Sequence, residues 1–280
     1  MTSALSGIRI LTIAANVPGP VAAARLRDLG ARVAKIEPPS GDLLAYAAPR
    51  WYAELHENIE VLRLDLKHEA ERATLHVRLA ESDVLVTSSR PAALARLGLA
   101  WSDLHALYPR LVQVAIVGRA SPHADDAGHD LTYQAAAGLL TPPQMPRALL
   151  ADLAGAERAV SAVLALLFAR ERHGEANYAE VSLEEGARAF AAPLRAGLTT
   201  PGGVLGGGSP HYACYRASDG WVALGNVEAH FQQRLARELE LDGAVDRKRL
   251  AALFLTRSAT EWEAWGAQRG LPIVAVATPW

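Results

Sequence analysis

Strand-like and helix-like segments alternate along the first two thirds of the chain. Residues 8–13 (IRILTI) are an apolar strand pattern, residues 21–30 (VAAARLRDLG) have helical composition and end in glycine, and residues 31–36 (ARVAKI) are again strand-like. This order predicts a βαβ unit with a right-handed crossover. Further strand patterns, with helical segments between them, follow at residues 61–66, 83–86, 111–117 and 178–182. The alternation therefore predicts an α/β fold built on an open, mostly parallel sheet.

In such sheets a ligand binds where the strands end at their carboxyl side. We therefore expect a site at the loops 14–20, 87–90 and 118–130. The turn at 17–20 precedes a helix and is predicted to offer free N–H groups to an anion. It has no G-x-G-x-x-G pattern, so a dinucleotide site is unsupported. Residues 40–60 have no clear period and are expected to be irregular.

The amino-acid composition of the chain changes after residue 196. Residues 197–210 (GLTTPGGVLGGGSP) are rich in glycine and proline and predict a linker. Beyond them, an Asp-Gly turn at residues 219–220 predicts a hairpin, and residues 228–239 predict a helix. We therefore expect a large domain over 1–196, a linker over 197–210 and a smaller α+β domain over 211–280.

The charge and cysteine content narrow the function classes. The formal net charge is −2, so there is no basic field for nucleic acid or an anionic membrane. Lysine occurs only at Lys35, Lys67 and Lys248, so a phosphate would have to be held by arginines and backbone N–H groups. The single cysteine, Cys214, excludes an intrachain disulfide. With no signal-peptide pattern at the start, we expect a cytoplasmic protein.

In the middle of the chain, Asp152 has a sequence context that suggests a role. It follows the apolar Leu149–Ala151 and precedes a long helical run at 153–172, which predicts an N-cap. Most aspartates in this setting are only caps. The surrounding stretch, from GHDLTYQAAAGLL to LLADLAGAERAVSAVLALLFARERHG, is what gives this one further significance.

That stretch and several others resemble family III of the CoA-transferases, which includes the α-methylacyl-CoA racemases. The similar segments are LSGIRILTIA, VPGPVAAARLRDLGARVAKIEPPSGD, LRLDLKHEAERATL, SSRPAALARLGLAWSDLHALYPRLV and GGGSPHYACYRASDGWVALGNVEAHF, in the family's order. The resemblance implies a Rossmann-like large domain, a linker and a small domain. It further implies a homodimer of interlocked rings and a coenzyme A thioester as substrate, with no prosthetic group.

The resemblance also assigns residues to chemistry. Asp152 matches the family's active aspartate, His129 the racemase histidine and Glu228 the racemase glutamate that orients it. In a racemase, the histidine and the aspartate exchange the α-proton of a 2-methylacyl-CoA, because so weak a carbon acid needs a base on each face. Backbone N–H groups at the start of the helix after Asp152 are expected to hold the enolate oxygen. The glycine segment at 206–208, followed by a hairpin, is more similar to the racemase branch.

Two alternatives stay open. In a CoA-transferase, Asp152 would instead form a mixed anhydride with the acyl group and then an aspartyl-CoA thioester. In a degenerate relative, the chain would bind an acyl-CoA or a partner without turnover. The resemblance places CoA contacts at Val17, Leu64, Ser88, Arg90 and Arg96 and assigns no metal ligands. Three features depart from the family: Thr87–Ser89 replaces Glu-Asn-Phe, acidic residues lie at 57–60 where family members are basic, and the match ends early, at residue 280.

Overall fold

Six parallel strands form the central sheet of the first of two units. They are β1 (Arg9–Thr12), β2 (Arg32–Glu37), β3 (Glu60–Arg63), β4 (Val84–Thr87), β5 (Val112–Val117) and β6 (Tyr178–Ser182). Their order is β3-β2-β1-β4-β5-β6, and every neighbouring pair is parallel. This is the Rossmann order, so the predicted α/β fold is confirmed. Every residue of β4 and β5 is buried, as expected of apolar strands covered on both faces.

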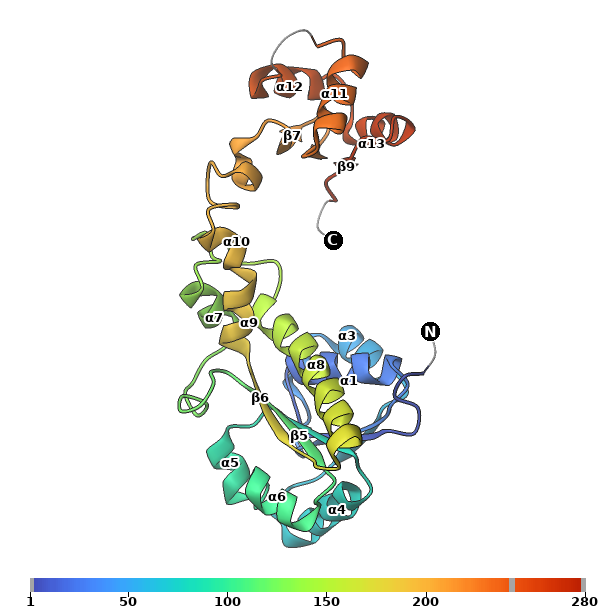
Figure 1. Ribbon diagram of the computed structural model, residues 1–280, viewed down its shortest axis with the longest axis vertical. Helices are drawn as coiled ribbons and strands as arrows, with labels where there is room; N and C mark the ends of the chain where they lie inside the picture. Colours follow the sequence, from blue (N-terminus) through green and yellow to red (C-terminus); the bar gives the residue numbers. More distant parts are fainter. Residues whose placement is uncertain (1–2, 242–244, 278–280) are drawn as a thin grey trace. The chain divides into compact units, whose positions relative to one another are not determined.

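Helices cover both faces of this sheet (Figure 1). On one face, α1 (Pro18–Asp28) and α8 (Leu150–His173) pack through small side chains against Ile10, Val84 and Val114. On the other face lie α4 (Glu69–Ala80), α5 (Pro91–Arg96) and α6 (Trp101–Leu107), whose leucines pack against Leu11 and Leu85. Adjacent strand residues face opposite cores because side chains alternate along a strand.

Residues 40–60 are more regular than predicted. They contain α2 (Leu43–Ala47) and α3 (Pro49–Leu55). The Asp42 side chain accepts from the N–H of Leu44 and caps α2, and Pro49 occupies the first turn of α3. Both are ordinary helix-start signals, but the helices are too short to show a period.

The computed structural model describes residues 3–241 and 245–277, and the boundary between its two units falls between Ala191 and Ala192. Two segments of the predicted small domain, 242–244 and 278–280, lie outside the described residues. The remaining elements of the first unit are α7 (Asp130–Ala136) and α9 (Leu183–Phe190).

The second unit contains an antiparallel sheet of order β7-β8-β9, formed by β7 (Tyr212–Arg216), β8 (Trp221–Gly225) and β9 (Ile273–Ala275). The first two strands are the predicted hairpin. Three helices, α11 (Ala229–Glu238), α12 (Arg247–Phe254) and α13 (Ala259–Gln268), enclose a core around Tyr215, Phe254 and Trp262.

The glycine-rich segment folds back on itself. It follows α10 (Ala192–Arg195) and contains η1 (Val204–Gly208), and the N–H of Leu205 donates to the Leu198 carbonyl at 2.9 Å. A Cβ added to Gly206 would lie 1.9 Å from the Thr200 carbonyl oxygen, so only glycine fits there.

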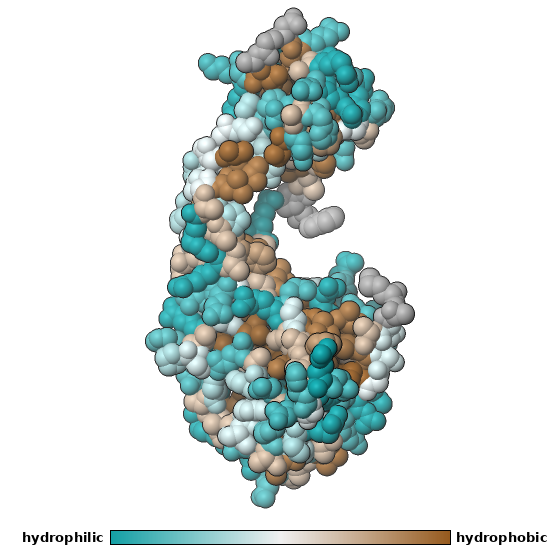
Figure 2. All heavy atoms as spheres, viewed as in Figure 1, coloured by the Kyte–Doolittle hydropathy of each residue, from teal (hydrophilic) through white to brown (hydrophobic). Residues whose placement is uncertain are grey.

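The surface of each unit mixes hydrophilic and hydrophobic side chains (Figure 2). Among the described residues, no helix is both long and apolar enough to span a bilayer.

Candidate functional site

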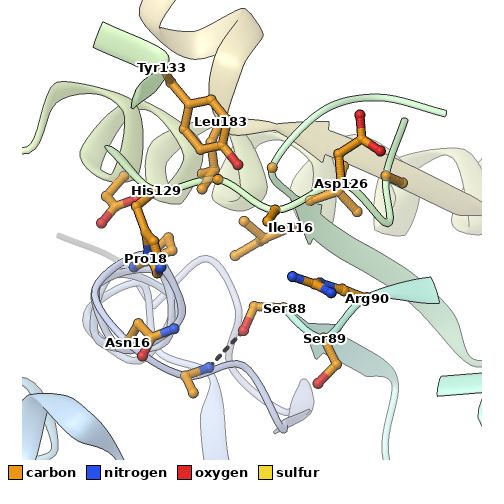
Figure 3. Close-up of a pocket in the computed structure, with 17 residues that line it drawn as sticks. Asn16, Pro18, Ser88, Ser89, Arg90, Ile116, Asp126, His129, Tyr133 and Leu183 are labelled. Atoms are coloured by element: carbon orange, nitrogen blue, oxygen red, sulfur yellow. Dashed lines mark hydrogen bonds between the residues drawn. The ribbon is translucent and has the colours of Figure 1, made fainter. Parts of the chain in front are cut away.

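A pocket of about 260 Å³ lies where β1, β4 and β5 end. Its wall includes Ala15 and Asn16 after β1, residues 88–90 after β4, and Ala124 and residues 126–129 after β5 (Figure 3). These are the three loops that the strand pattern predicts. The pocket lies at the switch point of the sheet, where β1 and β4 run side by side and the chain crosses over in opposite directions.

The loop after β1 offers fewer backbone N–H groups to an anion than the sequence predicts. Two of the first three residues of α1 are prolines, which have no N–H. The N–H groups of residues 14–16 are also engaged, because they donate to the side chains of Thr12, Ser88 and Asp42 at 3.0, 2.8 and 3.1 Å. Figure 3 shows the bond to Ser88 as a dashed line. These side chains fix the loop and leave few backbone donors for a ligand.

Asp152 lines the pocket from the first turn of α8 and is half-buried. The predicted N-cap role is wrong: α8 begins at Leu150, Leu149 is its N-cap, and no hydrogen bond to the Asp152 carboxyl is found among residues 3–241 and 245–277. Burial, and then the nearby Asp130 carboxylate, raise the pKa of Asp152 from 3.8 to about 7. The carboxyl is therefore present in both protonation states at neutral pH.

Asp130 is the residue that does the capping. It is buried, and its Oδ1 accepts from the N–H groups of Ala151 and Asp152 at 2.8 and 3.1 Å. Its Oδ2 accepts from the Gln134 amide at 2.6 Å. Asp130 thus satisfies the start of α8 from the first turn of α7. Sequence reasoning missed it, and the adjacent His129 and the amide at Gln134 were the only local signals.

His129 lines the same pocket as Asp152. It is the N-cap of α7, its imidazole is exposed, and its backbone N–H donates to Thr132 Oγ1 at 3.1 Å. One turn later, the buried Tyr133 ring forms another part of the wall, and burial raises its pKa. A Cβ at Gly128 would lie 2.2 Å from Tyr133 Oη, so this glycine lets the ring approach the loop that carries His129.

The other residues that the resemblance assigns lie in different places. Ser88 and Arg90 line the pocket, and the Arg90 guanidinium points toward its middle in Figure 3. Among the described residues that form the wall, Val17, Leu64 and Arg96 do not appear. Their contacts with CoA stay predictions.

Those three residues have structural settings of their own. Val17 is the half-buried N-cap of α1, Leu64 packs against the core around Leu85, and Arg96 is exposed at the end of α5. Glu228 belongs to the second unit, where it is the exposed N-cap of α11. Its pairing with His129 likewise stays a prediction.

The pocket can support acid–base or nucleophilic chemistry. A carboxyl that is half-protonated near pH 7 can donate or accept a proton, and its ionised form can attack a carbonyl. His129 supplies a second proton-transfer group. Within residues 3–241 and 245–277, no three His, Cys, Asp or Glu side chains are placed to hold a metal ion.

The sequence of this chain is similar to that of one family of known proteins. The model of the family described as CoA-transferase family III matches residues 5–279. The human α-methylacyl-CoA racemase is 30% identical over 92% of this chain and 74% of its own length. The formyl-CoA:oxalate CoA-transferase of Streptomyces avermitilis is 30% identical over 66% of this chain, which spans only 49% of the transferase.

Solved structures share the fold. The crystal structure of a hypothetical protein from Mycobacterium tuberculosis superimposes with a TM-score of 0.84 at 26% identity, covering 99% of this chain and 84% of that one. A CAIB/BAIF family protein from Brucella suis has a TM-score of 0.80 at 23% identity, covering 98% of this chain and 84% of that chain.

Proposed function

We propose, from the premise that this chain belongs to CoA-transferase family III, that it moves the α-proton of a 2-methylacyl-CoA thioester. His129 and Asp152 would be its acid/base pair. The observation that carries the proposal is the Asp152 carboxyl, whose pKa is about 7, in one pocket with His129. The thioester would be the substrate, and the proposal includes no prosthetic group.

In this mechanism, one of the two groups removes the α-proton and the other returns a proton to the opposite face of the carbon. Racemisation requires this two-sided arrangement, and Glu228 is proposed to orient His129. The enolate oxygen needs a different donor from the one predicted, because the N–H groups of Ala151 and Asp152 already donate to Asp130. Arg90 is a cationic donor in the wall of the same pocket.

CoA transfer is the second candidate, and the transferase relatives favour it. The ionised Asp152 would attack the thioester carbonyl, forming a mixed anhydride and releasing CoA as the thiolate. The thiolate would then attack the Asp152 carbonyl of the anhydride, giving an aspartyl-CoA thioester and the free carboxylate of the first acyl group. This chemistry needs a second carboxylic acid as acceptor and does not need His129.

Deuterium uptake at the α-carbon of a 2-methylacyl-CoA in D₂O separates the candidates. Under the racemase proposal, wild type takes up deuterium, and both Asp152→Asn and His129→Ala reduce the rate by about 10²-fold or more. Hydroxylamine trapping of an acylated Asp152, without uptake, would replace the racemase proposal by the transferase. Neither signal, together with no binding of CoA in calorimetry, would identify a degenerate relative without turnover.

We also propose that the protein is a cytoplasmic homodimer with interlocked subunits. The support is its membership of the family, whose resemblance implies this assembly. Sedimentation equilibrium of the full chain would give twice the mass of 29.8 kDa, and a monomer would contradict this part of the proposal.

A further inference from the structure

A buried cluster of charged and polar side chains lies beside the pocket but does not line it. Its centre is Lys35, on β2, whose Nζ lies 2.6 Å from Asp42 Oδ2 and 2.9 Å from Glu37 Oε1. All three side chains are at most 2% exposed. Lys35 is therefore unavailable to a phosphate, although it is one of only three lysines in the chain.

Tyr52 of α3 and His56, the residue that ends this helix, complete the cluster. His56 Nε2 lies 3.1 Å from Lys35 Nζ, and His56 Nδ1 lies 2.7 Å from the Tyr52 carbonyl oxygen. This arrangement requires a neutral imidazole. Its Nδ1–H donates a hydrogen bond to the Tyr52 carbonyl, and its Nε2 accepts one from the Lys35 ammonium. The Tyr52 hydroxyl donates to Glu37 Oε1 at 2.7 Å. The three N–H bonds of the ammonium thus have three acceptors: Asp42, Glu37 and His56.

The second carboxylate oxygen of Asp42 connects this cluster to a residue of the pocket wall. Oδ1 accepts from the N–H of Leu44, which caps α2, and from the N–H of Asn16 at 3.1 Å. Asn16 lines the pocket and has a φ of 65°, in the left-handed region. Asparagine adopts this conformation more readily than most residues with a side chain, and the hydrogen bond to Asp42 fixes its backbone N–H there.

A buried ion pair is seldom more stable than apolar side chains of the same volume. The Lys35–Asp42 pair is thus poorly explained by stability alone. The geometry of the pair suggests another role. One oxygen of the Asp42 carboxylate is paired with the Lys35 ammonium, and the other accepts from the backbone N–H of Asn16 in the pocket wall.

We infer that Asp42, locked by Lys35, is a positioning residue for the pocket: it holds Asn16 in the left-handed conformation and so sets the wall that a bound CoA thioester meets. The inference rests on the proposed function only for the identity of that ligand. Asp42 does not line the pocket, so it would act through Asn16.

The test compares the buried Lys35–Asp42 pair with the half-buried Arg170–Asp83 pair of the same unit. Asp42→Ala breaks the first. Asp83→Asn weakens the second, in which Arg170 lies 3.0 Å from Asp83 Oδ1 just before β4, at the other end of the sheet. Both variants are expected to lower the denaturation midpoint. Only Asp42→Ala is expected to weaken the binding of free CoA in calorimetry, by roughly tenfold, because it alone releases Asn16.

A glycine at position 16 distinguishes positioning from general damage. Glycine adopts a positive φ without help, so in an Asn16→Gly background Asp42→Ala should cost clearly less CoA affinity than in the native background. Equal losses in both backgrounds, or equal CoA affinity in wild type and Asp42→Ala, would overturn the inference. If Asp42→Ala alone does not fold, Asp42→Ala with Lys35→Met, which removes both charges and the oxygen that accepts from Asn16, takes its place in the same comparison.

Hydrogen exchange keeps this inference separate from the proposed function. The Asn16 amide is expected to exchange at least about tenfold faster in the Asp42 variant than in wild type, while Asp83→Asn leaves it unchanged. A wild type that binds no CoA would refute the proposed function, and faster exchange would still support the positioning role. Unchanged exchange at Asn16 would refute the positioning role even if CoA binds.

Discussion

Asp152→Asn should make the protein more stable while it abolishes activity. The pKa of the Asp152 carboxyl rises from 3.8 in an unfolded chain to about 7 in the fold, chiefly because the group is buried. Each unit of that difference corresponds to about 1.4 kcal/mol, so ionising the folded protein at pH 8 costs at most about 4 kcal/mol. An amide has the same shape and no charge, and the native carboxyl has no hydrogen bond to lose among the described residues.

The sign of the effect follows from the two pKa values. Well below pH 3.8 the carboxyl is neutral in both states, so wild type and variant should be equally stable there. As the pH rises toward 7, the folded protein holds its proton more tightly than the unfolded chain, and wild type loses stability relative to the variant. We expect a gain of about 2 to 4 kcal/mol for Asp152→Asn at pH 8, the lower value applying if water reaches the carboxyl.

Urea unfolding of both proteins between pH 4 and pH 8 measures this difference. The matched control is Asp103→Asn, since Asp103 occupies the same position in the first turn of α6 but is exposed. An exposed carboxylate there favours the helix, so the control should lose a little stability at pH 8. A variant at Asp152 that is no more stable than wild type at pH 8 would refute the claim that burial dominates this group.

Three further predictions concern neighbouring groups. Asp130→Asn should lower the pKa of Asp152, because it removes the nearby negative charge, and should shift the acid limb of the pH–rate profile to lower pH; an unshifted limb would contradict this. Burial lowers the pKa of His56, so stability should fall as the pH drops below about 6.5, and less so in His56→Gln when urea midpoints are compared. Gly128→Ala should cost about 1 to 3 kcal/mol, because the new Cβ meets the buried Tyr133 ring, and an unchanged melting temperature would contradict this.

The strands and the position of the pocket could be predicted because their signals are local. Residues 84–87 and 112–117 are apolar except for Thr87 and Gln113, and such runs between helical segments predict a parallel sheet. Once the sheet is parallel, its carboxyl ends must meet, and the loops after β1, β4 and β5 do line one pocket. Ser88, Arg90 and His129 lie in the predicted loops, whereas Asp152 lies outside them and was assigned only through the family resemblance.

The contacts that tune the site could not be predicted, because each joins residues far apart in sequence. Asp130 caps a helix 21 residues later, and Asp42 holds the N–H of a residue 26 positions earlier. A pattern of residue types within one segment carries no information about such pairs. Lys35 illustrates the same limit, since the sequence shows a scarce cation and only the fold shows that two carboxylates and an imidazole enclose it.

The surroundings of Asp130 and Asp152 differ in a way that supports the proposed role of Asp152. The Asp130 carboxylate accepts three N–H bonds, which fix both of its oxygens. Asp152 is half-buried beside that negative charge, so its own ionisation is costly and its proton is easily exchanged near pH 7. A group that must give and take a proton, or ionise in order to attack, benefits from this second environment. Asp130 therefore caps the start of α8 and, after burial, is the second cause that raises the pKa of Asp152, so removing it should damage the helix start and the proposed pH dependence together.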